Sequence, residues 1–446
     1  MHLKHMIYNN ILERFVIPIG DLVNRTDIYK QLRYWRRVSK MSADELDELE
    51  SNNLRELLSY ATRNIPFYKS NGNDEVDSPY DWIKQFPVIN KKIIKDNLDD
   101  LLGQDKSSLI KKSTSGSSGE QGVFYMSEKE QSLNRAIQIL WWEWSGWKMG
   151  SSILQTGMTV KRGWLKKSKD LFFKTRYVSA FDLSESETLT ILKKLRKKNN
   201  LYMGGYASSL YVYAQIAKEN NLKDVNFSCA ISWGDKVFPH YRKLFREVFG
   251  SEIIDTYACS EGLMMGAQAD LPYYYIMNPH VFVEILDDQN NEVEDGVLGN
   301  VVVTRLDSRA MPLIRYKPGD LAIKLKKEHY PKSRKLNFPL LKQIIGRDTD
   351  IVISPKGNLL IVHFFTAIFE FEESIKQFRV VQNCTENFKI EYIINANFKL
   401  ATLRKLENEM CVNAKENLSI IWDEVLDIPP TKSGKPQIIE SNLKAK

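Results

Sequence analysis

Residues 201–220, LYMGGYASSLYVYAQIAKEN, have the pattern of a buried strand, a glycine turn and a helix. The strand and turn return in FSCAISWGDKV at 227–237, which a helical pattern follows at 240–249, and in SEIIDTYACSEG at 251–262. Strands that alternate with helices predict an α/β fold built on a mostly parallel sheet. Because such sheets bind ligands beyond the carboxyl ends of their strands, we expect the functional residues at the ends of these runs.

The pattern changes after residue 275. HVFVEILDDQNNEVEDGVLGNVVVTRL at 280–306 holds two β-rich runs around a turn rich in Asp, Asn and Gly, which predicts an antiparallel hairpin. KQIIGRDTDIVISPKGNLLIV at 342–362 holds two more β-rich runs. This part of the chain is therefore expected to be richer in antiparallel strands than the part before it.

Length and pattern together predict two domains. A chain of 446 residues is too long for one small core. We place the boundary near Arg347, which gives a large N-terminal domain over 1–346 and a small, mobile α+β lid domain over 347–446. The large domain is expected to contain mixed, mostly parallel sheets with flanking helices, and to begin with a helical arm over about residues 1–65.

The N-terminal arm is aromatic and basic over residues 1–40 and reads as amphipathic. Docking onto the large domain is our first interpretation, and weak association with a membrane surface is the second. Ser42 and Glu45 then have the spacing of a capping box at the start of a helix, in which Asn52 and Asn53 predict a break.

Composition indicates a globular, cytoplasmic protein. Hydrophobic residues make up 43% and charged residues 27%, and no run approaches the roughly 18 uncharged apolar residues of a membrane span. The four cysteines lie far apart, which fits a reducing compartment. The net charge is +7, but acidic residues are interleaved and no nucleic-acid-binding module is present, so we expect no nucleic-acid partner.

The stretch KKSTSGSSGEQGVFYMS at 111–127 concentrates small and hydroxylated residues at one point. Backbone N–H groups of a glycine-rich loop can converge on phosphate oxygens, and serine and threonine hydroxyls add donors. A flexible linker is the alternative, and the loop is not of the Walker A type, because no Lys-Ser/Thr pair follows its last glycine. The candidate phosphate-binding residues are Thr114, Ser115, Gly116, Ser117, Ser118 and Gly119.

Four further blocks follow the loop: DTYACSEG at 255–262, PLIRYKPGDLA at 312–322, IIGRDTD at 344–350 and PPTKSGKPQ at 429–437. In this order the set resembles the adenylate-forming superfamily of acyl-CoA synthetases, peptide-synthetase adenylation domains and luciferases. The form of the blocks, with NIPFYK and FPVINKK upstream, looks most like the phenylacetate–coenzyme A ligase-like branch and its CapK-like, capsular-polysaccharide members. The resemblance runs from about residue 50 to the C-terminus.

The resemblance implies an ATP site in which the chain must neutralise and orient a triphosphate. The loop would hold the β- and γ-phosphates as pyrophosphate leaves, and Glu261 would bind Mg²⁺ through a hard carboxylate oxygen. Tyr257 matches the aromatic residue that stacks on adenine, and Ser260 the residue that faces the α-phosphate. Gly234 and Asp235 occupy the turn that lines the adenine.

Charged residues complete the implied site. Asp320 corresponds to the acid that grips both ribose hydroxyls, and Arg347 would add a second ribose contact at the hinge. Lys435 resembles the lysine of the small domain that bridges the carboxylate and the α-phosphate. Two alternatives stay open: Tyr257 could be a core residue, and Arg315 could pair with a neighbouring acid rather than touch the ligand.

The chain also departs from the family pattern. Gln121-Gly122 stands where many relatives close the phosphate loop with Pro-Lys, so one anchoring charge is missing. Thr349-Asp350 replaces the usual paired acids of the hinge. No zinc site is expected, because only Cys259 and His280 flank the segment that carries a cysteine-rich site in some relatives.

The resemblance implies that a small carboxylic acid is adenylated with ATP and Mg²⁺ and that its acyl group is then transferred. The CapK-like form favours an amine of an amino sugar or sugar nucleotide as acceptor, in the biosynthesis of surface polysaccharide such as capsule or O-antigen. Coenzyme A, which would give a thioester, is the alternative acceptor. A catalytically inactive nucleotide-binding or scaffolding protein is the alternative of another class.

Overall fold

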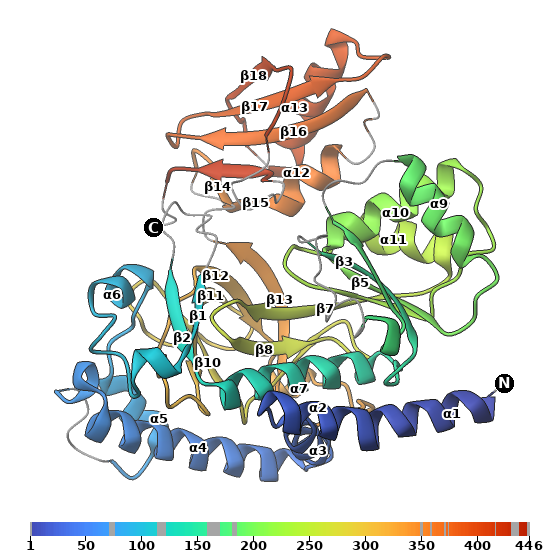
Figure 1. The fold of residues 1–446 in the computed structure, drawn as a ribbon. Helices are drawn as coiled ribbons and strands as arrows, with labels where there is room; N and C mark the ends of the chain where they lie inside the picture. The colour runs from blue at the N-terminus through green and yellow to red at the C-terminus, as the bar shows by residue number, and fades with distance from the viewer. Residues whose placement is uncertain are drawn as a thin grey trace.

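The computed structural model describes residues 2–70, 76–113, 122–157, 170–180, 185–347, 351–356, 359–369, 372, 374–414, 416–429 and 437–443. Its centre is a sheet in which eleven strands of the described chain run in the order β10-β11-β12-β13-β9-β8-β7-β6-β5-β3-β4 (Figure 1). Their bounds are β3 Ser152–Gly157, β4 Thr175–Ser179, β5 Leu201–Gly205, β6 Cys229–Ser232, β7 Ile253–Cys259, β8 Leu263–Ala267, β9 Tyr274–Ile276, β10 Val281–Leu286, β11 Leu298–Arg305, β12 Asp320–Lys324 and β13 Leu340–Arg347.

One half of this sheet, from β4 to β7, is parallel. Its strands alternate with the helices α9 (Glu185–Leu195), α10 (Ala207–Glu219) and α11 (Pro239–Phe249), which lie together beside that end of the sheet (Figure 1). The helices pack there because their apolar sides, such as Tyr213 and Phe245, are fully buried against the strands. The α/β fold predicted from residues 201–262 is confirmed.

The other half of the sheet is antiparallel. β7 turns directly into β8, and β10 pairs with β11 from the pair of Val281 and Arg305 to the pair of Leu286 and Asn300, which confirms the hairpin predicted at 280–306. A further hairpin, β1 (Ile110–Ser113) with β2 (Val123–Met126), stands beside this half (Figure 1). The parallel and antiparallel halves therefore meet at β7, which belongs to both.

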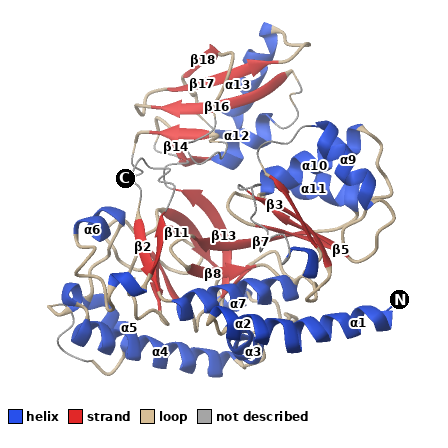
Figure 2. Cartoon of the chain, in the orientation of Figure 1, coloured by secondary structure: helices blue, strands red, loops and turns tan. Residues whose placement is uncertain are grey.

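Helices cover the lower side of the large sheet (Figure 2). They are α1 (His2–Ile11), a π-helical turn at Leu12–Val16, α2 (Ile17–Asn24), α3 (Ile28–Val38), α4 (Ala43–Asn64), α5 (Pro79–Trp82) and α7 (Glu128–Trp144). α6 (Lys91–Asp96) lies higher, beside the β1–β2 hairpin (Figure 1). Single 3₁₀ turns occur at Pro66–Tyr68, Ile83–Gln85, Lys106–Ser108 and Lys327–His329. The capping box of Ser42 and Glu45 begins α4 as predicted. The break predicted at Asn52–Asn53 is wrong, because the helix is continuous and the Asn53 amide donates 2.9 Å to the carbonyl of Pro279.

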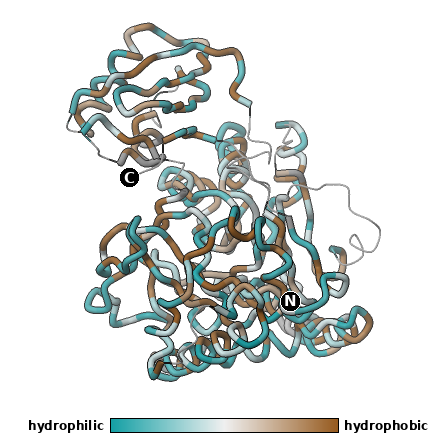
Figure 3. The backbone as a smooth tube through the Cα atoms, turned by 90° about the vertical axis from the view of Figure 1, so that its left-hand side faces the viewer, coloured by the Kyte–Doolittle hydropathy of each residue, from teal (hydrophilic) through white to brown (hydrophobic). Residues whose placement is uncertain are grey.

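The C-terminal part builds two small sheets that stand above the large one (Figures 1 and 3). β14 (Ile351–Ile353) pairs with β15 (Leu359–Ile361), and a second sheet has the order β18-β17-β16-β19. The remaining bounds are α12 Val362–Phe369, β16 Ile375–Gln382, β17 Phe388–Ile394, α13 Leu400–Ala414, β18 Ile420–Glu424 and β19 Ile439–Ser441. The expected small α+β unit is present, while the exact boundary near Arg347 stays a prediction.

The body and the C-terminal part are in contact. Phe238, which directly precedes α11 of the body, packs into the apolar core of the C-terminal part with Phe365 and Phe388. Nearby, within the body, the Lys236 ammonium donates 2.6 Å to the carbonyl of Ile345 in β13. Of the helices that the structure describes, none is long and apolar enough to cross a bilayer.

Candidate active site

A cavity of about 890 Å³ opens where β6 and β7 end, between α7 and the strands β12 and β13. Six of the residues that the sequence singled out line it: Gly234, Asp235, Tyr257, Ser260, Glu261 and Asp320. They come from three blocks of sequence, and the first two blocks sit at carboxyl ends of strands, where ligands of α/β sheets bind.

Tyr257 and Asp320 are joined across the cavity wall. Tyr257 lies on β7, and its phenol donates a hydrogen bond of 2.8 Å to a carboxylate oxygen of Asp320, the first residue of β12. Burial raises the pKa of Tyr257 well above its usual value, so the phenol keeps its proton and acts as the donor. The ring is both largely buried and part of the cavity lining, so the core and ligand interpretations of Tyr257 are compatible.

Glu261 lies in the turn between β7 and β8 and is almost fully buried. Its carboxylate accepts a hydrogen bond of 3.0 Å from the phenol of Tyr316, which fixes its direction. The next residue, Gly262, has φ +89°, and a Cβ there would come within 2.7 Å of the Arg305 guanidinium. Glycine therefore permits the tight turn that brings Glu261 and the exposed Ser260 to the cavity.

The carboxylate of Asp235 is already engaged by protein groups. It accepts hydrogen bonds from the backbone N–H of Ala207 at 2.5 Å, from that of Ser208 at 3.0 Å, and from the Ser208 hydroxyl at 2.6 Å. These groups form the first turn of α10, so Asp235 caps the start of that helix from another loop. Gly234 beside it has φ +84° and lies against the ring of Tyr206. Adenine binding at this turn stays a prediction.

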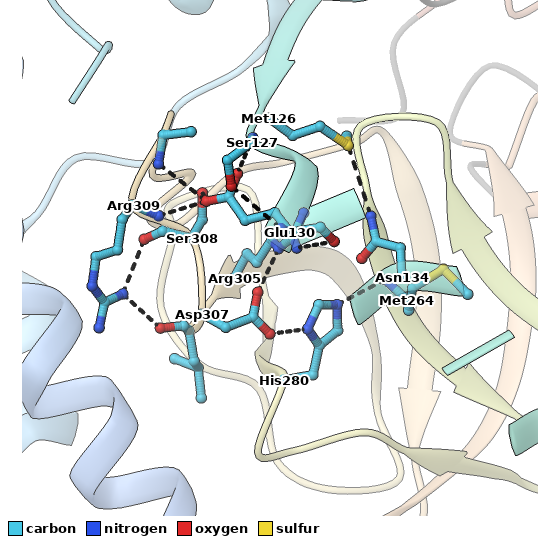
Figure 4. A network of polar contacts seen from close by, with 12 residues as sticks. Met126, Ser127, Glu130, Asn134, Met264, His280, Arg305, Asp307, Ser308 and Arg309 are labelled. Atoms are coloured by element: carbon cyan, nitrogen blue, oxygen red, sulfur yellow. Dashed lines mark hydrogen bonds and ion pairs between the residues drawn. The ribbon is translucent and has the colours of Figure 1, made fainter. Parts of the chain in front are cut away.

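A buried network beneath the turn holds these parts in place (Figure 4). The Glu130 carboxylate of α7 accepts from the backbone N–H groups of Arg309 and Ala310 at 2.7 and 3.0 Å. The Arg305 guanidinium donates 2.8 Å to Asp307, which also binds Nδ1 of His280. The network ties the start of α7 to the strand end of β11.

His280 connects this network to the segment after Glu261. Its Nε2 accepts 3.2 Å from the backbone N–H of Met264, so that nitrogen carries no proton and Nδ1–H faces Asp307. Burial lowers the pKa of His280, in agreement with a neutral ring. Both ring nitrogens are therefore occupied by protein groups, and no cluster of three metal-binding side chains occurs among the residues that the structure describes.

Sequence reasoning missed two groups that line the same cavity. The first is Asp255 on β7, whose carboxylate accepts a hydrogen bond of 2.5 Å from the phenol of Tyr274. The backbone N–H of Asp255 donates 3.1 Å to the side-chain oxygen of Gln268, and the same oxygen accepts 2.8 Å from the guanidinium of Arg242. Burial raises the pKa of Asp255 to about 6. Asp255 and Tyr257 are two positions apart on the strand, so the period of two of a β-strand places them on the same face and was the available signal.

The second missed group is a pair of cations. Lys112 on β1 and Arg135 on α7 both line the cavity. Burial lowers the pKa of Lys112, and the positive charge of Arg135 lowers it further, so the two cations lie near each other. Arg135 also forms an ion pair of 3.2 Å with Glu128. The signal in the sequence was the basic pair that directly precedes the glycine-serine loop.

Several predicted residues have no described side chain. The loop Thr114–Gly119 and Lys435 lie outside the described residues, as do Gln121 and the hinge pair Thr349-Asp350. Of Arg347 the structure describes the backbone, which pairs with Asp320 in the β12–β13 ladder. Arg315 forms a buried ion pair of 2.9 Å with Glu284, which decides its open alternative in favour of the neighbouring acid.

Comparison with known proteins shows what the chain is similar to. Residues 352–442 match the CapK C-terminal domain. The chain is 25% identical to Protein CapK of Staphylococcus aureus over 98% of its own length and 99% of that protein. It is 31% identical to phenylacetate-coenzyme A ligase of Pseudomonas putida over 32% of this chain and 31% of the ligase.

The fold is that of a solved ligase. The crystal structure of 2-hydroxyisobutyryl-CoA ligase in the postadenylation state matches with a TM-score of 0.70 at 17% identity, over 91% of this chain and 92% of the ligase. The same ligase in the thioesterification state gives a TM-score of 0.55. The chain is therefore similar to Protein CapK over nearly its full length, matches the CapK C-terminal domain over residues 352–442, and shares its fold with 2-hydroxyisobutyryl-CoA ligase.

Proposed function

We propose that this protein uses ATP to activate a small carboxylic acid as an acyl adenylate and then passes the acyl group to an acceptor. The observation that carries the proposal is the convergence of Tyr257 and Glu261, from one sequence block, and Asp320, from another, on one cavity large enough for a nucleotide. The relatives named above agree with this reaction class.

In the first half-reaction a carboxylate oxygen of the acid attacks the α-phosphorus of ATP. The bond from that phosphorus to the bridging oxygen of the β-phosphate breaks, and pyrophosphate leaves with the electron pair. We assign Asp320 to the ribose hydroxyls, Tyr257 to the adenine face and Ser260 to the α-phosphate. Lys435, together with the loop Thr114–Gly119, is assigned to the reacting phosphates by family resemblance.

Magnesium fits this site, because Mg²⁺ typically takes one or two carboxylates and completes its shell with phosphate oxygens and water. Glu261 is a buried carboxylate that lines the cavity, held in direction by Tyr316. When bound, the ion would neutralise charge on the phosphates. The group that this chain would contribute to the ion is the carboxylate of Glu261, just beyond the end of β7.

In the second half-reaction a nucleophile of the acceptor attacks the acyl carbonyl, and AMP leaves. We propose an amine of an amino sugar or sugar nucleotide as acceptor, in the synthesis of surface polysaccharide in the cytoplasm, on the strength of the full-length similarity to CapK. Coenzyme A is the second candidate, favoured by the partial match to phenylacetate-coenzyme A ligase. The lid, proposed as 347–446, would turn near Arg347 between the two steps.

The deciding experiment is ATP–pyrophosphate exchange with a panel of aryl, hydroxy and amino acids. We expect exchange with at least one acid, and exchange about 100-fold slower with Glu261→Gln at equal concentration. Exchange with no acid would overturn the proposal in favour of a nucleotide-binding scaffold. With the active acid in hand, product formed with amino sugars but not with coenzyme A supports the amide assignment, and the reverse supports the thioester.

A further inference from the structure

The N-terminal arm, defined here as residues 1–40, has two apolar sides. Its inner side docks onto the body: Leu12 and Ile17 are buried in one core with Trp35 of α3 and Trp141 of α7. Its outer side is exposed to solvent. The outer residues Ile7, Ile11, Phe15, Ile19, Leu22 and Val23 are between 47% and 81% exposed.

These outer side chains form one stripe. Ile7, Ile11, Phe15 and Ile19 follow each other at intervals of four, and Leu22 continues the row, so they share one side of the helix. From residue 7 to residue 23 the stripe is about 24 Å long at the usual helical rise. Six large apolar residues so exposed on one segment form a patch of a kind that marks an interaction site.

Residues 171–172 add two more exposed apolar side chains beside α1. Leu171 and Phe172 are 79% and 55% exposed, and the carbonyl of Phe172 accepts 2.7 Å from the phenol of Tyr8 in α1. The ammonium of Lys174 lies 4.1 Å from the centre of the Tyr8 ring, beside the same segment. The segment that carries these two exposed apolar side chains is therefore in contact with α1, and Lys174 adds a cation at that contact.

The arm carries a large excess of positive charge. Residues 1–40 contain eight Lys or Arg and three Asp or Glu, so five of the chain's seven net positive charges lie there. All three acids are engaged by the protein itself. Glu13 pairs with Arg36, Asp21 accepts from Tyr29 N–H at 2.8 Å, and Asp27 accepts from the Gln31 amide at 2.8 Å. Arg14 and Lys30, by contrast, are exposed.

We propose that the arm binds the surface of an anionic lipid bilayer, with the stripe inserted among the headgroups and the basic residues against lipid phosphates. An exposed apolar stripe flanked by cations is the pattern of an interfacial helix. A second copy of the chain fits less well, because a two-fold contact would bring the same five-charge excess from each copy together. The arm lies along the edge of the body opposite the C-terminal sheets, so attachment leaves them uncovered (Figure 1).

Cosedimentation with vesicles tests the proposal on the full-length protein. The probes are phosphatidylcholine vesicles with about one third phosphatidylglycerol and pure phosphatidylcholine vesicles. The wild type is expected to bind the anionic vesicles and to release as salt rises, because screening weakens the electrostatic part. The triple change Ile11→Ser, Phe15→Ser and Leu22→Ser should lower the partition coefficient at least about tenfold. Arg14→Glu with Lys30→Glu should weaken binding to anionic vesicles only.

A matched control removes as many exposed apolar side chains elsewhere: Leu400→Ser, Val412→Ser and Leu426→Ser in the C-terminal part. It should bind as the wild type does. Retained ATP–pyrophosphate exchange and an unchanged thermal transition would show that the arm variants are folded. Equal binding of wild type and arm triple variant, or no binding of the wild type to anionic vesicles, overturns the proposal. So does light scattering that finds a wild-type dimer which the arm change converts to a monomer.

Discussion

The phenol of Tyr257 donates a hydrogen bond of 2.8 Å to Asp320, so the residues proposed to hold adenine and ribose are joined to each other. Tyr257→Phe keeps the ring and loses this bond. Because a hydrogen bond to a carboxylate contributes roughly 1.5–3 kcal/mol, and only part of this is passed on to the bound nucleotide, we expect the KM for ATP to rise about fivefold. Asp320→Ala removes a charged partner and should raise it by roughly 100-fold. Tyr392→Phe in the C-terminal part is the matched control, and a wild-type KM in Asp320→Ala would refute the ribose assignment.

Glu261→Gln tests the magnesium assignment. The glutamine oxygen can still accept from Tyr316, so the turn is preserved while the charge is lost. We expect the exchange rate to fall about 100-fold and the half-saturating Mg²⁺ concentration to rise. Tyr316→Phe, which keeps the charge and loses the orienting bond, should cause a smaller loss. An unchanged Mg²⁺ titration in Glu261→Gln would contradict the assignment.

Asp255 predicts a pH-dependent stability term. Its folded pKa is raised to about 6 by burial, above the unfolded value near 3.8. The stabilising contribution of this group is therefore present at low pH and is lost as pH rises through 6. Asp255→Asn abolishes the titration, so relative to wild type the variant should gain about 2 kcal/mol between about pH 4.5 and pH 7.5. Urea unfolding at both pH values measures the difference, and a constant difference would count against it.

Lys112 is expected to take over the charge that the loop lacks at Gln121-Gly122. Lys112→Met should raise the KM for ATP and pyrophosphate about tenfold, because a charged contact to phosphate is worth roughly 1.5–3 kcal/mol. Lys111→Met is the matched control, since Lys111 is the neighbouring residue of the same strand and is exposed. Equal effects of the two changes would show a general charge effect in place of a specific contact.

Lys435→Ala separates chemistry from binding. The lysine is assigned to the transition state of adenylation, so its loss should lower exchange at least about 100-fold. Nucleotide affinity, measured by calorimetry with a non-hydrolysable ATP analogue, should stay close to that of the wild type. A fall in affinity that matches the fall in rate would assign Lys435 to ground-state binding.

Sequence patterns predicted best where one physical requirement acts locally. The buried strands before Gly234 and Glu261, the capping box at Ser42 and the hairpin at 280–306 all depend on neighbours in sequence, and all are present. Asn53 shows the limit: two asparagines weaken a helix locally, but the amide of Asn53 finds its partner at Pro279, far along the chain.

The candidate site shows the same division. Single blocks supplied Glu261, Tyr257 and Asp320, but nothing local indicates that Tyr316 orients one of them. The capping of α10 by Asp235 was also hidden, because it joins a loop residue to the start of a helix that lies 27 and 28 positions earlier in the sequence. Contacts of this kind are fixed by the way strands assemble, which a single sequence does not display.

The register of β12 with β13 sets Asp320 opposite Arg347, one rung of a ladder whose far strand continues toward the C-terminal sheets. If the lid turns about Arg347, the β12–β13 pairing couples this motion to the strand that carries Asp320, the proposed ribose contact. Nucleotide occupancy and lid position would then change together, so that the return of the lid would promote the release of AMP.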